Sequence, residues 1–224
     1  MTQPVALITG FEPYGGRGCN PAAEVAARLD GVTIAGVRLV GRNFPVAFRP
    51  LKELIPAALD EVDPAVVISL GLCPGEAVIR LERVAINVAD FEIPDNDGVV
   101  LVDQQVDADG AAAVFATLPL RQIQLALLDA GIPARLSNSA GTYLCNKTLY
   151  HFLCAIEARG RAVPCGFMHL PYVPEQVAVM IAEMQAARSI ERQRRTDIPS
   201  MSLEVMVQAV RIALEVTLAD GEGS

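Results

Sequence analysis

The stretch PVALITGFEPYGGRGCNPAAEVAARL, residues 4–29, joins a short apolar run, a glycine-rich loop and a helical pattern. Val5–Thr9 predicts a buried strand, and Pro21–Leu29 predicts a helix. Asn20 supplies a capping side chain, and Pro21 occupies the first helical position, where a missing N–H costs nothing. The stretch therefore predicts a strand–loop–helix unit.

The same alternation of strands and helices continues along the chain. It predicts an α/β protein in three layers, α/β/α, around an open and mostly parallel sheet. Further strands are predicted at Val32–Val40, Val66–Leu70, Val78–Val88, Ala134–Asn138 and Cys165–His169. Further helices are predicted at Pro50–Val62, Leu120–Ala130, Tyr143–Ala158, Pro174–Ala187 and Leu203–Leu218. A kink or split is expected at Pro56, because proline lacks the helical N–H donor.

Length and composition predict a single domain over residues 1–224. A chain of 224 residues buries about 70% of its unfolded surface, which is enough for one sizeable core. No linker, charge block or internal repeat divides it. Residues 218–224 are expected to form a disordered tail, and the hydrophilic stretch Arg188–Pro199 a mobile surface loop.

Charge and cysteine usage argue against several classes of partner. The formal charge of −8 disfavours nucleic acid and anionic membranes, which require a basic face. No apolar run reaches the ~18–20 residues of a spanning helix, and the N-terminus lacks the pattern of a signal peptide. Five cysteines without a CxxC pair indicate free thiols, so a cytoplasmic protein is expected. Two histidines without a metal-ligand spacing predict no metal site.

Four loops rich in Gly, Pro or Asn follow predicted strand ends. Sites in open α/β sheets form at the carboxyl ends of strands, so these loops are where a site is expected. The loops are Gly10–Gly18, Gly71–Gly75, Asn138–Thr142 and His169–Pro174.

Cys145 is the candidate nucleophile. It falls in the first turn of a predicted helix, where the positive end of the macrodipole favours a thiolate and lowers the thiol pKa. The alternative is that it is a small buried hydrophobe, as free cysteines usually are. Cys73, in the loop Gly71–Gly75, is the rival nucleophile, whereas Cys154 and Cys165 have the surroundings of core residues.

His169 is the candidate general base. It ends a predicted strand and lies on the same rim as Cys145 if the strands leading to both are parallel. His151, six residues after Cys145 on one helix, points away from it. Glu82 could orient the base as in other triads, although a Glu between two arginines is more often a surface ion pair.

The loop Gly10–Gly18 carries two aromatic residues, Phe11 and Tyr14. It has neither the GxGxxG spacing nor a Walker lysine, which argues against a phosphate loop. Aromatic side chains in a glycine-rich loop suit a flat apolar ring, and the alternative is a turn whose aromatics cover the core.

Together these segments resemble the type I pyroglutamyl peptidases, which are cysteine peptidases. The similar blocks occur in family order over nearly the whole chain. They are residues 9–16 with Asn20-Pro21, residues 82–87, residues 93–96, residues 137–146 and residues 166–176.

The resemblance implies a phosphorylase/hydrolase-like sheet, a homotetramer, no cofactor and a Cys–His–Glu triad. The triad falls on Cys145, His169 and Glu82. The implied substrates are N-terminally pyroglutamylated peptides, from which pyroglutamate is released. The implied substrate-binding positions are Phe11 and Tyr14, whose rings grip the lactam, and Leu72 and Tyr143, whose backbone groups read it.

Glu92 departs from the family pattern, which has an arginine there that assists at the oxyanion. Losing such a donor typically costs about 10²–10³ in rate, roughly 3–4 kcal/mol. Activity then requires that Glu92 turn to solvent, or that Arg80 or Arg83 substitute. The alternative function is a binding protein for pyroglutamyl peptides or a related lactam, without hydrolysis. A nucleoside phosphorylase rests on fold analogy alone, and no arginine cluster supports it.

Overall fold

The computed structural model describes residues 3–186 and 197–221 of the chain. Within them, a seven-stranded sheet has the order β10-β5-β11-β4-β1-β3-β2. Neighbouring strands are parallel except at β5–β11 and β2–β3, which are antiparallel. The strands are β1 Val5–Phe11, β2 Thr33–Ile34, β3 Val37–Phe44, β4 Val66–Leu72, β5 Ile79–Glu82, β10 Ala134–Ser137 and β11 Cys165–Leu170.

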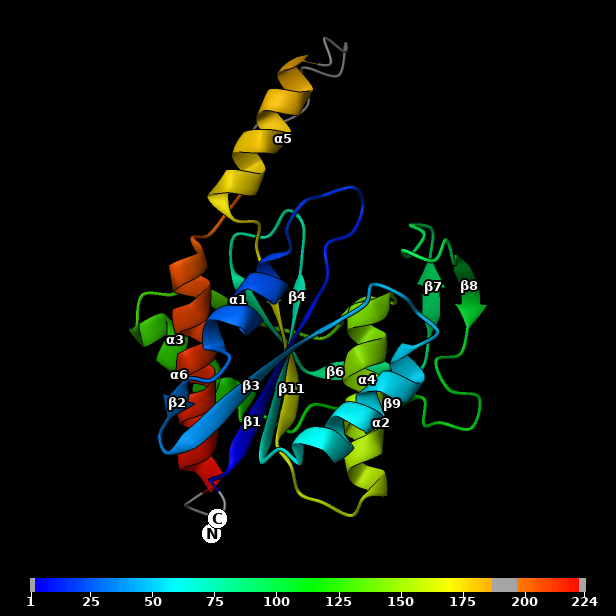
Figure 1. Cartoon of the computed structure of the whole chain (residues 1–224), viewed down its shortest axis with the longest axis vertical. Coiled ribbons are helices and arrows are strands. Elements are labelled where there is room, and N and C mark those ends of the chain that lie inside the picture. The colour runs from blue at the N-terminus through cyan, green and yellow to red at the C-terminus, as the bar shows by residue number, and fades with distance from the viewer. Residues whose placement is uncertain (1–2, 187–196, 222–224) are drawn as a thin grey trace.

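Helices cover both faces of this sheet, as Figure 1 shows. Helices α1, α3 and α6 lie on one face, α2 and α4 lie on the other, and α5 projects beyond the sheet. Their bounds are α1 Pro21–Leu29, α2 Leu51–Val62, α3 Leu120–Asp129, α4 Leu144–Ala158, α5 Pro174–Ala186 and α6 Leu203–Gly221. The predicted three-layer α/β/α arrangement with a mostly parallel sheet is confirmed.

Alternation along the strands gives the core two large clusters, one on each face of the sheet. Ile8 of β1 and Met168 of β11 belong to the cluster beneath α1, α3 and α6. Leu7 and Phe167, one residue away on the same strands, belong to the cluster beneath α2 and α4. Successive strand side chains point to opposite faces, so a sheet covered on both sides needs continuous apolar strands. All seven residues of β4 are accordingly buried.

Two small antiparallel sheets lie outside the main sheet, near α4 (Figure 1). β6 (Val84–Ile86) pairs with β9 (Ala113–Phe115), and β7 (Ala89–Phe91) pairs with β8 (Leu101–Gln104). The asparagine Asn146 of α4 fixes β6 in place, because its Oδ1 accepts from Ile86 N at 2.9 Å. The prediction of a single strand over Val78–Val88 is therefore wrong: its first part joins the main sheet as β5 and its second part leaves as β6.

The single strand predicted at Val32–Val40 is also wrong. The chain turns at Ala35 and Gly36, which have φ values of 46° and 78°, and returns antiparallel as β3. Glycine adopts positive φ without a steric penalty, so Gly36 is the signal for this turn. By contrast, α2 continues through Pro56, where no split occurs.

The disordered tail predicted over residues 218–224 is wrong for residues 218–221, because helix α6 continues to Gly221. Residues 222–224 lie outside the described residues. Most of the predicted loop Arg188–Pro199 lies outside them as well. In the part of the chain that the structure describes, no helix is long and apolar enough to cross a membrane.

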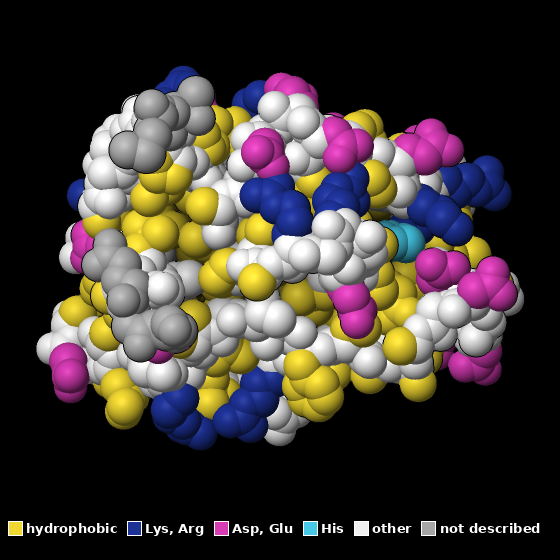
Figure 2. Space-filling model, turned by 90° about the horizontal axis from the view of Figure 1, so that it is seen from below, with side chains coloured by type: hydrophobic (Ala, Val, Ile, Leu, Met, Phe, Trp, Pro, Cys, Tyr) yellow, Lys and Arg dark blue, Asp and Glu magenta, His cyan; other side chains and the backbone are white. Residues whose placement is uncertain are grey.

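Figure 2 views the end of the molecule opposite α5. There, acidic and basic side chains are interspersed with hydrophobic ones, and no continuous basic face is visible in this view.

Candidate active site

Cys145 is the second residue of α4, and its thiol lies against Gly71 at the end of β4. A Cβ built on Gly71 would lie 2.8 Å from Cys145 Sγ. A side chain at position 71 would therefore occupy the space of the thiol. Residues 138–143 carry the chain from β10 to this place.

His169 and Glu82 form a buried pair on neighbouring strands. His169 Nδ1 lies 2.7 Å from Glu82 Oε1, and the two residues are 5% and 0% exposed. The pair results from the antiparallel register of β11 and β5, in which Phe167 is opposite Glu82 and His169 is opposite Arg80. The carboxylate leaves the other ring nitrogen, Nε2, for a reacting group, as in other triads.

The thiol and the imidazole occupy the same face of the sheet. Gly71 is the register partner of His169, and the Cβ position of Gly71 also meets the Phe167 ring at 2.8 Å. Phe167 and His169 lie two residues apart on one strand, with ring centroids 4.8 Å apart. Cys145, His169 and Glu82 thus come together. The sequence predicted this only for parallel strands leading to Cys145 and His169, and that condition is not met, because β10 runs antiparallel to β11.

The predicted lowering of the Cys145 pKa is wrong. Burial raises the pKa of the Cys145 thiol to about 12, and Cys73 and Glu82 add to the rise. The thiol's own backbone N–H and Arg80 act in the opposite direction. Burial therefore outweighs the helix terminus, and a base is needed to form the thiolate.

A cavity of about 50 Å³ opens beside the thiol. All four residues predicted to bind substrate line it. Its lining consists of Phe11, Tyr14, Asn20, Val46, Leu72, Tyr143, Leu144 and Cys145. The lining is mostly apolar, which suits a small ring held between flat side chains. Burial, followed by the nearby Cys145, raises the pKa of the Tyr14 phenol to about 12, so this hydroxyl stays protonated.

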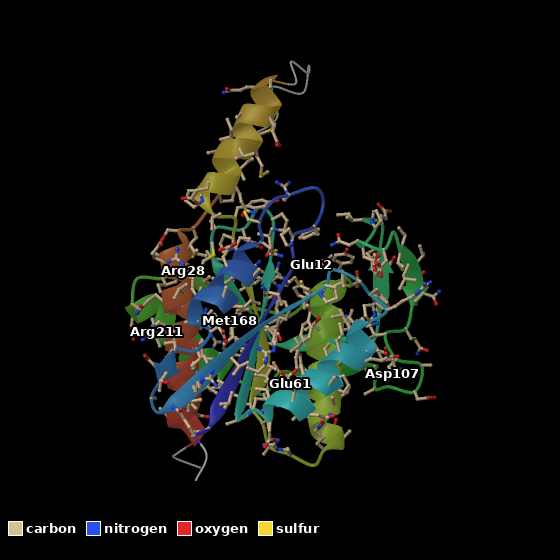
Figure 3. The ribbon with its side chains drawn as sticks, viewed as in Figure 1. Glu12, Arg28, Glu61, Asp107, Met168 and Arg211 are labelled. Atoms are coloured by element: carbon tan, nitrogen blue, oxygen red, sulfur yellow. The ribbon has the colours of Figure 1, made fainter. Side chains whose placement is uncertain are left out.

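Two carboxylates shape the loops around this cavity. Glu12 accepts from Val46 N at 3.1 Å and from Asn96 Nδ2 at 3.0 Å. In Figure 3, Glu12 is labelled above the sheet, toward α4. Asp95 is buried and accepts from Phe48 N at 2.6 Å. Sequence reasoning gave neither residue a role, although both lie in the motifs that carried the resemblance.

Glu92 is exposed, and its neighbour Phe91 fills the space beside the cavity. The Phe91 ring packs edge-on against the Tyr143 ring, with 4.7 Å between the ring centroids, and its centroid lies 5.7 Å from that of the Phe48 ring. Glu92 follows directly after the last residue of β7, and its exposure means that the side chain turns to solvent.

Arg80 and Arg83, the proposed substitutes for the family's arginine, are both engaged elsewhere. The Arg80 guanidinium binds protein groups with all three of its nitrogens. Arg83 Nη1 donates to Asn138 Oδ1 at 3.2 Å. Neither side chain is therefore placed as a replacement donor.

Of the remaining titratable candidates, Cys73 lies near enough to raise the Cys145 pKa, whereas His151 and Cys165 are buried elsewhere. Cys73 is half-buried, and burial raises the pKa of its thiol despite the opposing Arg80. His151 lies buried in α4, where burial, followed by Lys147, lowers its pKa to about 4. Cys165 is fully buried in β11, which confirms it as a core residue.

The sequence and the fold have counterparts among known proteins. Over residues 5–220 the chain matches the family model described as pyroglutamyl peptidase. It is 40% identical to the pyrrolidone-carboxylate peptidase of Pyrococcus furiosus, over 96% of this chain and 98% of that protein. It is also 40% identical to pyrrolidone-carboxylate peptidase 2 of Photorhabdus laumondii, over 99% and 94% of the two chains. A crystal structure of the P. furiosus pyrrolidone carboxyl peptidase superposes with a TM-score of 0.88 at 39% identity, covering 96% of this chain and 99% of that one.

Proposed function

Because this chain belongs to the pyroglutamyl peptidase family and is a cysteine peptidase by that membership, we propose that it hydrolyses the amide bond after an N-terminal pyroglutamyl residue. The products are free pyroglutamate and the shortened peptide. The observation that carries the proposal is the juxtaposition of the Cys145 thiol with the His169–Glu82 pair beside an apolar cavity. The family match also favours a peptidase over the nucleoside phosphorylase hypothesis.

In the proposed reaction, His169 takes the proton of the Cys145 thiol as the sulfur attacks the carbonyl carbon of the amide bond that follows the pyroglutamyl ring. The imidazolium then protonates the leaving amine, and the C–N bond breaks to leave a thioester. A water molecule, deprotonated by His169, attacks this thioester and releases pyroglutamate and the thiol. Glu82 holds His169 in the tautomer that presents Nε2 and stabilises the imidazolium.

The cavity provides the specificity in this proposal. Phe11, Tyr14 and Tyr143 offer flat faces to a five-membered lactam, and Leu72 closes the apolar wall. A cavity of about 50 Å³ admits little more than a small ring. The unblocked N-terminal residue of an ordinary peptide would bring a charged ammonium group into this apolar lining, at a large desolvation cost.

Oxyanion stabilisation does not depend on residue 92 in this proposal. The N-terminus of α4 has no side-chain cap, so its first N–H groups are available near the thiol. Such backbone donors stabilise a developing oxyanion. The exposure of Glu92 supports the same conclusion, because a solvated carboxylate opposes the developing charge weakly.

The test is turnover of a fluorogenic pyroglutamyl amide by wild type and by Cys145→Ala. Cys73→Ala controls for the rival thiol, and Cys154→Ala controls for loss of a cysteine outside the site. We expect turnover to vanish only in Cys145→Ala. A wild type that binds pyroglutamate without turnover would support the lactam-binding alternative, and turnover by Cys145→Ala would refute the nucleophile. Light scattering on the same samples tests the homotetramer that family membership leads us to propose.

A further inference from the structure

Arg80 lies behind the His169–Glu82 pair and contacts its carboxylate. Arg80 Nε is 3.2 Å from Glu82 Oε1, the same oxygen that faces His169 Nδ1 at 2.7 Å. The two side chains are 17% and 0% exposed. Neither Arg80 Nε nor Glu82 Oε2 has a hydrogen-bond partner among the described residues, so the Arg80–Glu82 contact is a close ion pair without hydrogen-bond geometry. This ion pair and the contact with His169 compensate the buried charge of Glu82.

The other guanidinium nitrogens of Arg80 bind two separate strand-end segments. Nη2 donates to Ser137 Oγ and to Ser139 O, both at 2.7 Å, at the start of the connection to Cys145. Nη1 donates to Cys73 Sγ at 3.2 Å and to Glu76 Oε1 at 3.4 Å, in the loop after β4. One planar group therefore joins the segment that leads to the nucleophile with the segment that supports the thiol at Gly71.

The charge balance around Arg80 keeps it a cation. Burial lowers the pKa of the guanidinium, but Glu82, and after it Cys73 and Glu76, more than offset this and hold the pKa above its ordinary value. A permanent cation therefore lies at contact distance from the buried carboxylate that faces the imidazole.

We propose that Arg80 is a positioning residue for the reaction, fixing the Glu82 carboxylate toward His169 and fixing the approach of the chain to Cys145. This inference rests on the proposed function of the triad. It differs from the role of the family's arginine, because Arg80 makes no contact with the reacting groups except through Glu82 and the loop at Ser137–Ser139.

The charge of Arg80 also acts on the nucleophile. The titratable and charged groups that influence Cys145 are Cys73, Glu82, Arg80, Tyr14 and Tyr143, with His169 on the facing strand. Arg80 is the cation of this set that lowers the pKa of the Cys145 thiol. A unit charge several ångströms away, at the effective dielectric of a protein site, shifts a pKa by about one unit. Removing the charge therefore raises the thiol pKa.

The experiment compares Arg80→Met, Arg80→Lys and the matched control Arg83→Met in the full chain. Arg83 is three residues along the same segment and contacts Asn138 rather than Glu82. Two readouts are measured: the pH dependence of kcat/KM, and the pH dependence of Cys145 alkylation by iodoacetamide, located by peptide mass mapping. Circular dichroism melts verify that each variant folds.

For Arg80→Met we expect kcat to fall about 10²-fold with KM nearly unchanged, because positioning of the base is lost while the cavity is intact. The acid limb of kcat/KM should move up by about one pH unit, and Cys145 alkylation at fixed pH should slow by about tenfold. In Arg80→Lys the acid limb of kcat/KM should return to its wild-type pH, because lysine retains the positive charge. Only part of kcat should return, because lysine lacks the planar guanidinium that binds several groups at once. Arg83→Met should match wild type.

An unchanged acid limb and alkylation profile in Arg80→Met would overturn the proposal, as would an equal shift in Arg83→Met. If Arg80→Met fails to fold, the double variant Arg80→Met/Glu82→Gln removes both buried charges. Relative to Glu82→Gln alone, its Cys145 alkylation should be slower by about the tenfold that loss of the Arg80 charge predicts, and an unchanged alkylation profile would overturn the proposal. Absence of turnover in wild type would count against the proposed function, whereas the alkylation comparison would still test Arg80.

Discussion

Adding one methyl group at Gly71 tests the geometry on which the site depends. In Gly71→Ala the new carbon would lie 2.8 Å from Cys145 Sγ and 2.8 Å from Phe167 Cζ. Carbon and sulfur in ordinary contact are about 3.5–4.0 Å apart, so the thiol or the ring must move by about 1 Å. A displacement of about 1 Å at a reacting atom costs about 10²-fold in rate.

The same methyl group also overpacks the core, at a cost of about 1–3 kcal/mol in the free energy of unfolding. For a chain of this size that corresponds to a fall in Tm of about 3–10 °C. The assay is kcat on a fluorogenic pyroglutamyl amide, measured well below the lowered Tm, beside a thermal melt. We expect a kcat about 10²-fold below wild type and a modest fall in Tm.

Gly166→Ala is the matched control for this experiment. Its new carbon would meet Leu118 Cδ1 at 2.5 Å, in the core cluster on the opposite face of the sheet. It should therefore lower Tm comparably and leave kcat near wild type. The reasoning fails if Gly71→Ala retains kcat within threefold of wild type, or if Gly166→Ala loses kcat equally.

Three further perturbations test the charges. Glu82→Gln should lower kcat by about 10²–10⁴-fold with little change in KM, because the amide cannot stabilise the imidazolium, and steady-state kinetics will contradict this if KM alone changes. Burial lowers the pKa of His151 to about 4, so His151 is neutral in the folded chain while it takes up a proton near pH 6.5 when unfolded. The free energy of unfolding therefore keeps the contribution of neutral His151 above pH 6.5 and loses it as the pH falls toward 4, with a loss of about 2 kcal/mol at pH 5. In urea melts, the free energy of unfolding of His151→Gln should fall less steeply over this pH range than that of wild type. Glu92→Arg should change kcat/KM by less than about threefold because residue 92 is exposed, and a gain of 10² would mean that its charge reaches the oxyanion.

The order of strands and helices was predictable from sequence because most of them follow simple periodicities. The capped start of α1 at Asn20-Pro21 is one example, and the structure places the helix at the predicted residues. What periodicity does not contain is strand direction. Nothing in Ile79–Glu82 indicates that β5 runs antiparallel to β11, since its alternation of apolar and charged residues predicts a strand but not the direction of that strand.

The residues of the site were predicted by resemblance more than by local chemistry. Glu82, flanked by Arg80 and Arg83, has the pattern of a surface ion pair, and only the register with β11 makes it a buried partner of His169. The error on the Cys145 pKa has a physical origin as well. The macrodipole is a local property that sequence reveals, whereas burial depends on the tertiary packing of Phe167 and Gly71 against the thiol.

The position of β11 in the sheet has a consequence for synthesis of the protein. β11 is the last of the described sheet strands along the chain, yet it lies between β4 and β5, made some ninety residues earlier. Until residues 165–170 have left the ribosome, β10 and β5 have no link to β4 within the sheet. The step that joins the two parts of the sheet is the step that brings His169 to Glu82. A nascent or truncated chain therefore carries the thiol without the base that we propose for it, and on that proposal peptidase activity begins only when β11 has joined the sheet.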